Sequence, residues 1–322
     1  MSLSEETARV AGGGKDTLKV IIQKMGVTVG SEKIDQYPTL AEKILPAARA
    51  VVNVYADTGT QVTMTKGGTS LAATSSGGVA TLYPTELGEW SVSYTFKGSK
   101  KTKTYTLDSI GIKTVYPFEI GDSLNDTDWA NIALCSQYGF AKDVFKIGDV
   151  KNLVFDGENC PVQIIGFDHD DLVSGGKAGI TFQTVNFTKK TTTSVWNQTR
   201  GIRDTLSGYL SSFPSDLRSA IKPVTKKTAD KNTGSIYTTQ DSLFLLSEIE
   251  VTGSTSLSSP GEGSQYDWYK AGNSKLKYYE GVVSSWWLRS SKHGDSWVMD
   301  VYETTGSSNP SNTYGAAFAF CM

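Results

Sequence analysis

The eight residues from Glu89 to Phe96, EWSVSYTF, alternate bulky apolar side chains with polar or small ones. In an extended strand this alternation places Trp90, Val92 and Tyr94 on one face together with Phe96. We expect that face to be buried in a core. The stretch therefore predicts a packed β-sheet at this point of the chain.

The strand pattern extends in both directions, over residues 47–116. Further short alternating runs are separated by Gly-rich and Asp-rich turns, as in AVVNVYA, QVTMTK, GVATLYP and KTYTLDSI. Strands at this spacing without a helical period predict a β-sandwich. The motifs VTM at 62–64, GVATL at 78–82 and LGEWSV at 87–92 resemble small immunoglobulin-like or carboxypeptidase-regulatory-like modules. The resemblance implies a spacer or a binding module.

Residues 1–46 differ from this pattern. Three glycines, Gly12 to Gly14, follow a polar start, and Leu40, Ile44 and Leu45 then recur at helical spacing. We predict a flexible arm that ends in an amphipathic helix. Two interpretations stay open for it, namely docking on a neighbouring subunit and a plain N-terminal appendage.

Residues 117–322 mix both kinds of pattern. Helices are predicted from Trp129, with Asp128 as cap, around residues 199–211, and after Pro214. Strands are predicted in FKIGDVKNLVF, CPVQIIGFDHDD, SLFLLSEIEV, VSSWWLRSS, SWVMDVYE and AAFAFCM. The whole chain is thus predicted to be α+β and β-rich, with an arm (1–46), a sandwich (47–116) and a third, larger domain (117–322).

Composition excludes several functions. The net charge of the 322 residues is only -2, which argues against nucleic acid as a partner. No apolar run reaches the length of a signal peptide core or a membrane span, so we expect no membrane insertion and synthesis in the cytoplasm. Three cysteines and two histidines without paired spacing argue against a zinc site, and no cofactor is expected.

Five motifs in the third domain occur together in order. They are IGD at 147–149, QIIGFDHDD at 163–171, TQDSLFLLSE at 239–248, Gln265-Tyr266, and WWLRS at 286–290. In this combination the domain resembles an uncharacterised family of C-type-lectin-like domains, found at the C-termini of prophage tail and surface proteins of Gram-positive gut bacteria. That family carries a Gly-Val-Arg-Pro-like phrase before its last strand, where this chain has YGAAF at 314–318. The resemblance implies two helices around small antiparallel sheets, with loops near 253–280 and 303–315 as the display surface.

Aromatic residues in and after the long polar loop are the candidate contacts for a ligand or receptor. Tyr and Trp offer large contact areas at a low entropy cost, and they stack on sugar faces. The alternative is a loop that folds down, so that its aromatic side chains fill a small core. The candidate residues are Tyr266, Trp268, Tyr269, Tyr278, Tyr279 and Tyr314.

The WWLRS motif is predicted to be structural. In a strand, Trp286 faces one side and Trp287 and Arg289 the other. We expect buried indoles and an arginine that pairs with a carboxylate, with Asp241 and Glu248 as candidate partners. A direct role in ligand binding is the lesser alternative.

No motif indicates a catalytic or metal site. The acidic run Asp168 to Asp171 lacks the spacing of a calcium loop and is interpreted as a solvated turn. The three cysteines are interpreted as buried thiols. A Ser-His-Asp set would need His169 or His293 as base, and His293 lies in a polar loop without a nucleophile-elbow motif. No motif points to a carboxylate pair for glycoside cleavage either, and we therefore predict no enzyme.

Together these features predict a virion protein, a phage or prophage tail tip or fibre component assembled in the cytoplasm of the bacterial host. Its expected partners are other tail or baseplate proteins and a host cell-surface glycan or protein. A homo-oligomer, such as a trimer or another ring, would multiply weak contacts. The alternatives are a purely structural tail or baseplate component and an enzyme on the same fold.

Overall fold

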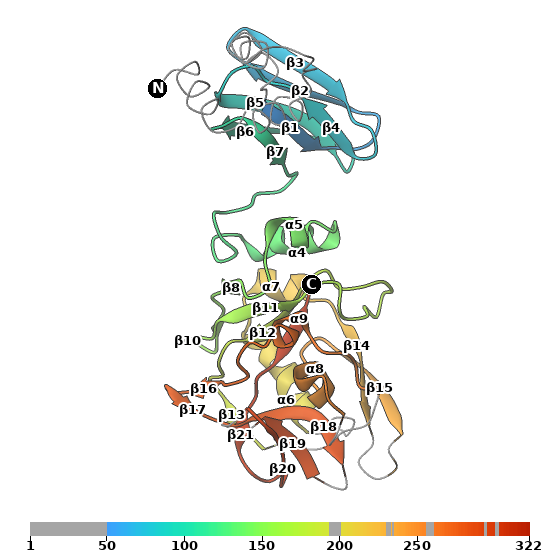
Figure 1. Cartoon of the computed structure of the whole chain (residues 1–322), viewed down its shortest axis with the longest axis vertical. Coiled ribbons are helices and arrows are strands. Elements are labelled where there is room, and N and C mark those ends of the chain that lie inside the picture. Colours follow the sequence, from blue (N-terminus) through green and yellow to red (C-terminus); the bar gives the residue numbers. More distant parts are fainter. Residues whose placement is uncertain are drawn as a thin grey trace, which may run out of the picture. The chain divides into compact units, whose positions relative to one another are not determined.

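The computed structural model describes residues 50–192, 201–229, 233, 235–255, 261–292, 295–299 and 303–322. The chain divides into two compact units, Met1–Pro117 and Phe118–Met322 (Figure 1). The predicted arm, residues 1–46, and its helix lie outside the described residues. Strands predominate over helices in the described part of the chain, so the β-rich α+β prediction is confirmed at this level.

The first unit is built from two sheets. One has the order β4-β1-β7 and the other β3-β2-β5-β6. The strands are β1 (Ala50–Tyr55), β2 (Gln61–Lys66), β3 (Thr69–Thr74), β4 (Val79–Leu82), β5 (Gly88–Phe96), β6 (Ser99–Leu107) and β7 (Gly111–Val115). β1 pairs antiparallel with β4 and parallel with β7, whereas neighbours in the other sheet are antiparallel.

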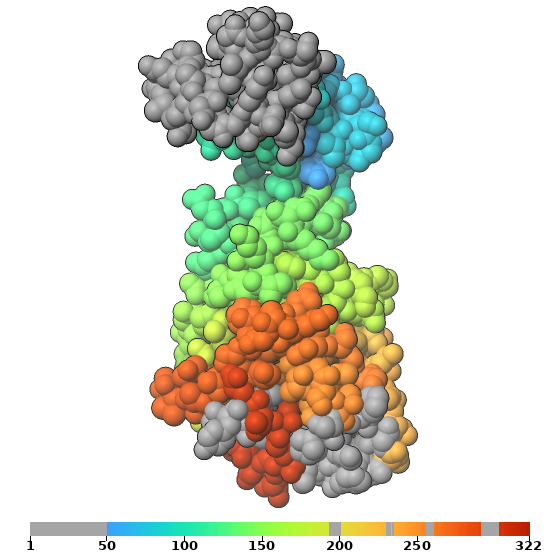
Figure 2. All heavy atoms as spheres, viewed as in Figure 1, coloured from blue at the N-terminus to red at the C-terminus, as the bar shows by residue number. Residues whose placement is uncertain are grey.

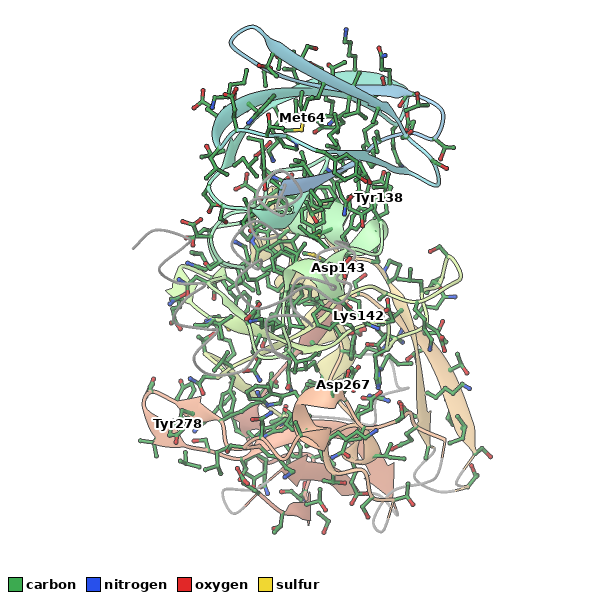
Figure 3. The ribbon with its side chains drawn as sticks, turned by 45° about the horizontal axis from the view of Figure 1, so that its top comes forward. Met64, Tyr138, Lys142, Asp143, Asp267 and Tyr278 are labelled. Carbon is green, nitrogen blue, oxygen red and sulfur yellow. The ribbon has the colours of Figure 1, made fainter. Side chains whose placement is uncertain are left out.

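The alternation in β5 determines the core of this unit. Trp90, Val92 and Tyr94 are buried as predicted, and Phe96 is half-buried. Val52 and Val54 of β1 belong to the same apolar cluster, as does Met64 of β2 (Figure 3). One core therefore joins both sheets.

Two strands of this unit were not predicted. β3, TSLAAT, has small and polar side chains and no buried residue, so its sequence lacks the apolar alternation. β7, GIKTV, buries only Val115. Both strands are stabilised chiefly by the ladder to a better-defined neighbour, a long-range effect that local sequence does not reveal.

Within its described residues, the second unit contains two larger sheets and three hairpins. The first sheet has the order β22-β12-β11-β8 and the second β13-β21-β18-β19-β20. Their strands are β8 (Val150–Lys151), β11 (Val162–Gly166), β12 (Thr181–Thr184), β13 (Lys190–Thr191), β18 (Trp286–Lys292), β19 (Asp295–Met299), β20 (Thr305–Ser308), β21 (Tyr314–Gly315) and β22 (Ala319–Cys321). The hairpins are β9 (Val154–Phe155) with β10 (Glu158–Asn159), β14 (Val224–Ala229) with β15 (Ile236–Asp241), and β16 (Tyr278–Tyr279) with β17 (Val282–Val283).

Short helices accompany these sheets. They are α4 (Trp129–Gln137), α5 (Ala141–Val144), α6 (Ile202–Tyr209) continued by the 3-10 turn Leu210–Ser212, α7 (Ser215–Ala220), α8 (Glu248–Thr252) and α9 (Asp267–Lys270). The helices predicted from Trp129, near 199–211 and after Pro214 are α4, α6 and α7. Asp128 precedes α4, but its side chain makes no capping hydrogen bond there.

Aromatic packing joins the start and the end of this unit. The Trp129 ring of α4 meets Phe182 and Phe320 edge-on, with centroid distances of 5.7 and 6.1 Å. Phe182 and Phe320 stack on each other at 5.2 Å. The Ser136 hydroxyl donates to the Met322 carbonyl at 2.5 Å. Helix α4 thus covers the sheet that contains β22.

The strand predicted in SLFLLSEIEV is wrong: in its first half only Phe244 makes an isolated bridge, to Ala319, and in its second half the chain forms helix α8. Ser247 and Glu250 make a capping box, in which the Ser247 hydroxyl accepts from the Glu250 N–H at 3.3 Å and the Glu250 carboxylate accepts from the Ser247 N–H at 3.0 Å. The S-x-x-E spacing that favours this turn is present in the sequence. The preceding apolar run obscured it.

Among the described residues, no helix has both the length and the apolar character needed to cross a membrane.

Candidate functional site

The WWLRS strand, β18, lies in the interior of the second unit. Trp286, Trp287, Leu288 and Arg289 are all buried. The indole N–H of Trp286 donates to the Lys275 carbonyl at 3.0 Å, and that of Trp287 to the Thr191 carbonyl at 2.7 Å. Both large side chains therefore contribute packing and have satisfied polar atoms.

Arg289 pairs with Glu250. Its guanidinium binds both carboxylate oxygens of Glu250, with an Nη2–Oε1 distance of 2.9 Å, and it also donates to the Leu245 carbonyl at 3.0 Å. The predicted partners, Asp241 and Glu248, are wrong. Asp241 pairs with Arg203, and Glu248 accepts from the Thr305 hydroxyl at 3.1 Å. The capping box explains the difference, because it turns the Glu250 side chain back toward the interior.

The ion pair continues into a buried chain of charges. Lys226 Nζ lies 2.7 Å from Glu250 Oε1 and 2.7 Å from Asp170 Oδ1. Burial by itself would raise the pKa of Asp170, but the Lys226 ammonium and His169 outweigh it and hold that pKa well below its ordinary value. Arg289 and Lys226 likewise outweigh burial and lower the pKa of Glu250. We call Asp170, Lys226, Glu250 and Arg289 the buried charge chain.

The three aspartates of the acidic run Asp168 to Asp171 pair with different lysines. Asp168 pairs with Lys142 at 2.8 Å, and Asp171 pairs with Lys177 at 2.7 Å, both at the surface. Asp170 alone points inward. In the part of the chain that the structure describes, no group of three or more His, Cys, Asp or Glu side chains could hold a metal ion.

The loop aromatics do not share one environment. Tyr266 and Tyr269 are buried, so their prediction as displayed contacts is wrong and the loop is folded down at these positions. The Tyr266 hydroxyl donates to Asp170 at 2.9 Å, and the Tyr269 hydroxyl to Gln183 at 2.5 Å. Trp268 is half-buried against Gly148, where an added Cβ would lie 2.7 Å from the indole.

Two of the other candidates, Tyr278 and Tyr279, form strand β16 of the β16–β17 hairpin. Tyr278 and Val282 are 40% and 67% exposed. Tyr279 stacks on Phe187 at 6.0 Å, and the Lys190 ammonium lies 4.3 Å from the centre of the Tyr279 ring. Tyr314 of strand β21 lies apart from them: its ring meets the buried Trp287 ring at 4.9 Å, and the Ser308 hydroxyl donates to its hydroxyl at 3.3 Å. We call Tyr278, Tyr279, Val282 and Lys190 the hairpin surface.

The hairpin surface stands out from the body of its unit. The β16–β17 hairpin projects at the side of the sheet that contains β13 and β21 (Figure 1). Figure 2 shows it as an orange lobe, and Figure 3 places Tyr278 at this edge. Close packing underlies the surface, since the Phe187 ring occupies the place of a side chain at Gly315, 2.2 Å from an added Cβ.

A buried lysine fastens the base of the hairpin. Lys277 directly precedes β16, is 3% exposed, and donates to the carbonyl oxygens of Thr184 and Val185. No carboxylate pairs with it among the described residues. Burial lowers the pKa of Lys277 to about 7. The Tyr278 N–H adds a bond of 3.0 Å to the Asn186 side chain.

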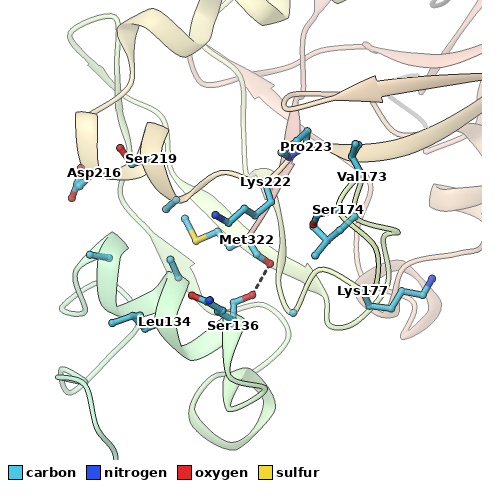
Figure 4. A pocket seen from close by; sticks show the side chains of 16 residues that line it. Leu134, Ser136, Val173, Ser174, Lys177, Asp216, Ser219, Lys222, Pro223 and Met322 are labelled. Carbon is cyan, nitrogen blue, oxygen red and sulfur yellow. Dashed lines mark hydrogen bonds between the residues drawn. The ribbon is translucent and has the colours of Figure 1, made fainter. Parts of the chain in front are cut away.

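A separate groove of about 800 Å³ lies between α4, α7 and the loop around Val173 (Figure 4). Its floor is largely apolar, with Ala133, Leu134, Ala220 and Met322 among the lining residues. None of the predicted site residues lies in this groove. The Lys222 side chain extends into it (Figure 4).

Comparison with known proteins matches one part of the chain. Residues 175–321 match the model of a family described as a domain of unknown function (DUF6273). No curated protein and no solved structure matches the chain. The matched range contains Lys226, Glu250 and Arg289 and the hairpin surface, whereas Asp170 precedes it.

Sequence reasoning missed the charges that organise this unit. Lys226, Glu250 and Lys277 carried no motif of their own, and only Glu250 had a local signal, the capping box with Ser247. Lys226 stands in the polar run VTKKTA, where its inward orientation is set by pairing with β15 and by two distant carboxylates.

Replacing Arg289 by methionine should destabilise the second unit strongly. Glu250 would keep its ion pair with Lys226 but lose both hydrogen bonds from the Arg289 guanidinium. Breaking a buried ion pair costs about 3–5 kcal/mol of stability. Urea unfolding of the full chain measures the loss. The double variant Arg289→Met, Glu250→Met should lose less than the sum of the two single variants. Lys113→Met, which removes an exposed pair with Asp108, is the control and should change little. Additive losses would contradict the coupling.

Stability should rise with pH because of Lys277. Its pKa is about 7 in the folded chain, against an ordinary value of 10.5, so between these values the unfolded chain holds a proton that the folded chain lacks. Folding then gains about 1.4 kcal/mol per pH unit from this group, and the gain is absent below about pH 7. The unfolding free energy of the natural chain minus that of Lys277→Met is measured at pH 7, 8 and 9. This difference should become more positive as the pH rises, by about 1.4 kcal/mol per pH unit. A constant difference would refute the assignment.

Proposed function

We propose that the chain is an adhesion component of a bacteriophage tail tip or fibre, and that its second unit presents the hairpin surface to a receptor on the bacterial cell. The observation that carries this proposal is the exposed aromatic hairpin on a firmly packed base. In this proposal the first unit is an immunoglobulin-like spacer, and the second is a C-type-lectin-like domain assembled into the virion.

The chemistry of the hairpin surface favours a receptor with flat, partly apolar faces. Tyr278 and Tyr279 provide rings with hydroxyl groups, Val282 adds apolar area, and Lys190 adds a cation beside a ring. Such rings stack on sugar faces and lose little entropy on binding. A cell-surface glycan fits this set, and an exposed protein loop is the second class that does.

Anchoring supports the same proposal. Lys277, Asn186 and Phe187 hold the base of the hairpin, so its side chains are ordered before a receptor arrives. A preorganised surface loses less free energy on binding than a mobile one. One such surface gives weak binding, and several copies in a homo-oligomer would multiply it.

The apolar groove favours a second candidate function. A structural tail or baseplate component would pack on neighbouring subunits, and a groove of about 800 Å³ with an apolar floor offers a place for an apolar segment of a neighbour. In that case the hairpin surface would have no receptor.

The double variant Tyr278→Ala, Tyr279→Ala should bind host cells at least about tenfold more weakly, because it removes both rings of the surface. Labelled full-length protein, titrated on a panel of Gram-positive gut bacteria and followed by flow cytometry, gives the apparent Kd. Competition with purified cell-wall polysaccharide distinguishes a glycan receptor from a protein one.

The matched control is Ile236→Ala, Tyr237→Ala on β15, where the two side chains are exposed to similar extents, 40% and 43%. This control should bind as well as the natural chain. If both double variants lose binding equally, or if neither loses it, the hairpin surface is not the receptor-binding site. Either result would favour the structural candidate.

A further inference from the structure

A small pocket opens next to the buried charge chain. Its volume is about 310 Å³, and His169, Asp170, Lys226, Glu262 and Ser264 are among the residues that line it. The His169 ring stacks on the buried ring of Tyr266, with 3.9 Å between their centres. The imidazole is therefore held in one orientation at the pocket wall.

Three side chains in this pocket stand in the order hydroxyl, imidazole, carboxylate. Ser264 Oγ lies 3.2 Å from His169 Nε2. On the opposite side of the ring, His169 Nδ1 lies 3.8 Å from Asp170 Oδ1. Ser264 is exposed, His169 is half-buried and Asp170 is buried. This is the order of nucleophile, base and orienting carboxylate in acyl-transfer enzymes.

The carboxylate is fixed as such a role requires. Asp170 accepts from Lys226, Tyr266 and Thr181, at 2.7, 2.9 and 2.6 Å. Burial would raise the pKa of Asp170, but the Lys226 ammonium outweighs it and helps to hold that pKa well below its ordinary value. His169 Nδ1 is itself buried and has no hydrogen-bond partner among the described residues. The 3.8 Å between His169 Nδ1 and Asp170 Oδ1 is longer than a hydrogen bond, and catalytic hydrogen bonds are often long without substrate.

Two oxygen atoms of Ser264, the hydroxyl and the carbonyl oxygen, lie within hydrogen-bond distance of His169 Nε2. With the proton on Nδ1, facing Asp170, Nε2 accepts from the Ser264 hydroxyl. The Ser264 carbonyl oxygen also lies 3.1 Å from Nε2. In the neutral ring that oxygen favours the opposite tautomer, but once Nε2 has taken the serine proton it accepts from the resulting N–H. The carbonyl thus stabilises the imidazolium that the reaction would form.

Local backbone geometry brings Ser264 to this position. Gly263 has a φ of +140°, and an added Cβ there would lie 2.7 Å from Glu250 Oε1, so only glycine fits beside the buried charge chain. The N–H groups of Gly263 and Ser264 donate no hydrogen bond to the described part of the chain. They are therefore candidates for donors to an oxyanion.

We propose that Ser264, His169 and Asp170 form a hydrolytic site for carboxylic esters, as a second activity of this unit. Ser264 Oγ attacks the acyl carbon while His169 Nε2 takes its proton, and the proton passes to the departing alcohol oxygen as the ester bond breaks. Water then attacks the acyl-serine and gives a proton to His169, which returns it to Ser264 Oγ as the carboxylic acid leaves. Ester and water yield acid and alcohol, with no other reactant.

The pocket defines the class of substrate. Its volume is at the small end of the range for ligand pockets, which fits a short acyl group such as acetyl. Its lining is polar and charged, with Thr225, Asp171 and Lys177 beside the buried chain, which fits a hydroxyl-rich alcohol. An acetyl ester of a sugar combines both properties.

Sequence alone could not reveal this set. Ser264 and His169 are separated by 95 residues, and Ser264 follows Gly-Glu-Gly rather than a nucleophile-elbow motif. The fold brings them together because Tyr266, two residues after Ser264, donates a hydrogen bond from its hydroxyl to Asp170, the residue that follows His169.

Full-length protein tests the proposal with two readouts. Hydrolysis of p-nitrophenyl acetate, and of an acetylated sugar by acetate release, should fall at least about 100-fold in kcat/KM in Ser264→Ala and in His169→Gln. A fluorophosphonate probe should label Ser264 in the natural chain, identified by peptide mass spectrometry, and should fail to label it in His169→Gln. Ser174→Ala, an exposed serine in the separate apolar groove, should keep full activity.

Ser264→Ala removes one exposed hydroxyl and should fold normally, which an unchanged melting temperature verifies. The proposal is overturned if Ser264 is not labelled, or if the natural chain hydrolyses both esters no faster than Ser264→Ala does. The hairpin variants should retain the activity, so this outcome is independent of receptor binding.

Discussion

The buried ion pair between Arg289 and Glu250 is the interaction on which the second unit depends most. A charge without water must be paired and hydrogen-bonded, so each member of the chain from Arg289 to Asp170 requires the next. These four side chains come from β18, α8, β14 and the loop after β11. Replacing one of them by an apolar side chain would leave its neighbour in the chain with a buried charge that has lost a partner. The chain therefore specifies how these elements pack, more than it adds to total stability.

Both proposed activities lie on supports that this packing creates. On one side, Tyr266 reaches Asp170 and brings Ser264 beside His169. On the other, β18 carries Trp286 and Trp287, whose indoles hold the segments that lead to the hairpin and to β13. The hairpin itself depends on Lys277, a buried amine that donates to the carbonyl oxygens of Thr184 and Val185. Buried polar groups thus position exposed ones throughout this unit.

The sequence predicted structure best where the determining contacts are local. The alternation in EWSVSYTF predicted the buried face of β5, because neighbours two residues apart share a face of any strand. Helices α4, α6 and α7 had local start signals. β3 and β7 had none, and the Ser247–Glu250 capping box was hidden behind an apolar run.

The candidate site was less predictable, because contacts with residues far away in the sequence decide which of its side chains are buried and which are exposed. Tyr266 and Tyr278 belong to the same loop region with several aromatic residues, yet one is buried and the other is 40% exposed. The difference is Asp170, 96 residues away, which accepts the Tyr266 hydroxyl. Likewise Arg289 pairs with Glu250 and not with Asp241 or Glu248, since only the fold decides which carboxylate points inward.

Native-state hydrogen exchange on the full chain tests most directly whether the buried charge chain organises the second unit. Three amides report on it: Ser247, which donates to the Glu250 carboxylate, Tyr266, which donates to the Glu250 carbonyl, and Arg289, which donates to the Leu246 carbonyl. We expect all three to exchange together, with one opening free energy among the highest in residues 118–322. Exchange of the Tyr266 amide well ahead of the other two would show that the segment carrying Ser264 opens independently of the buried charge chain, which would contradict its organising role.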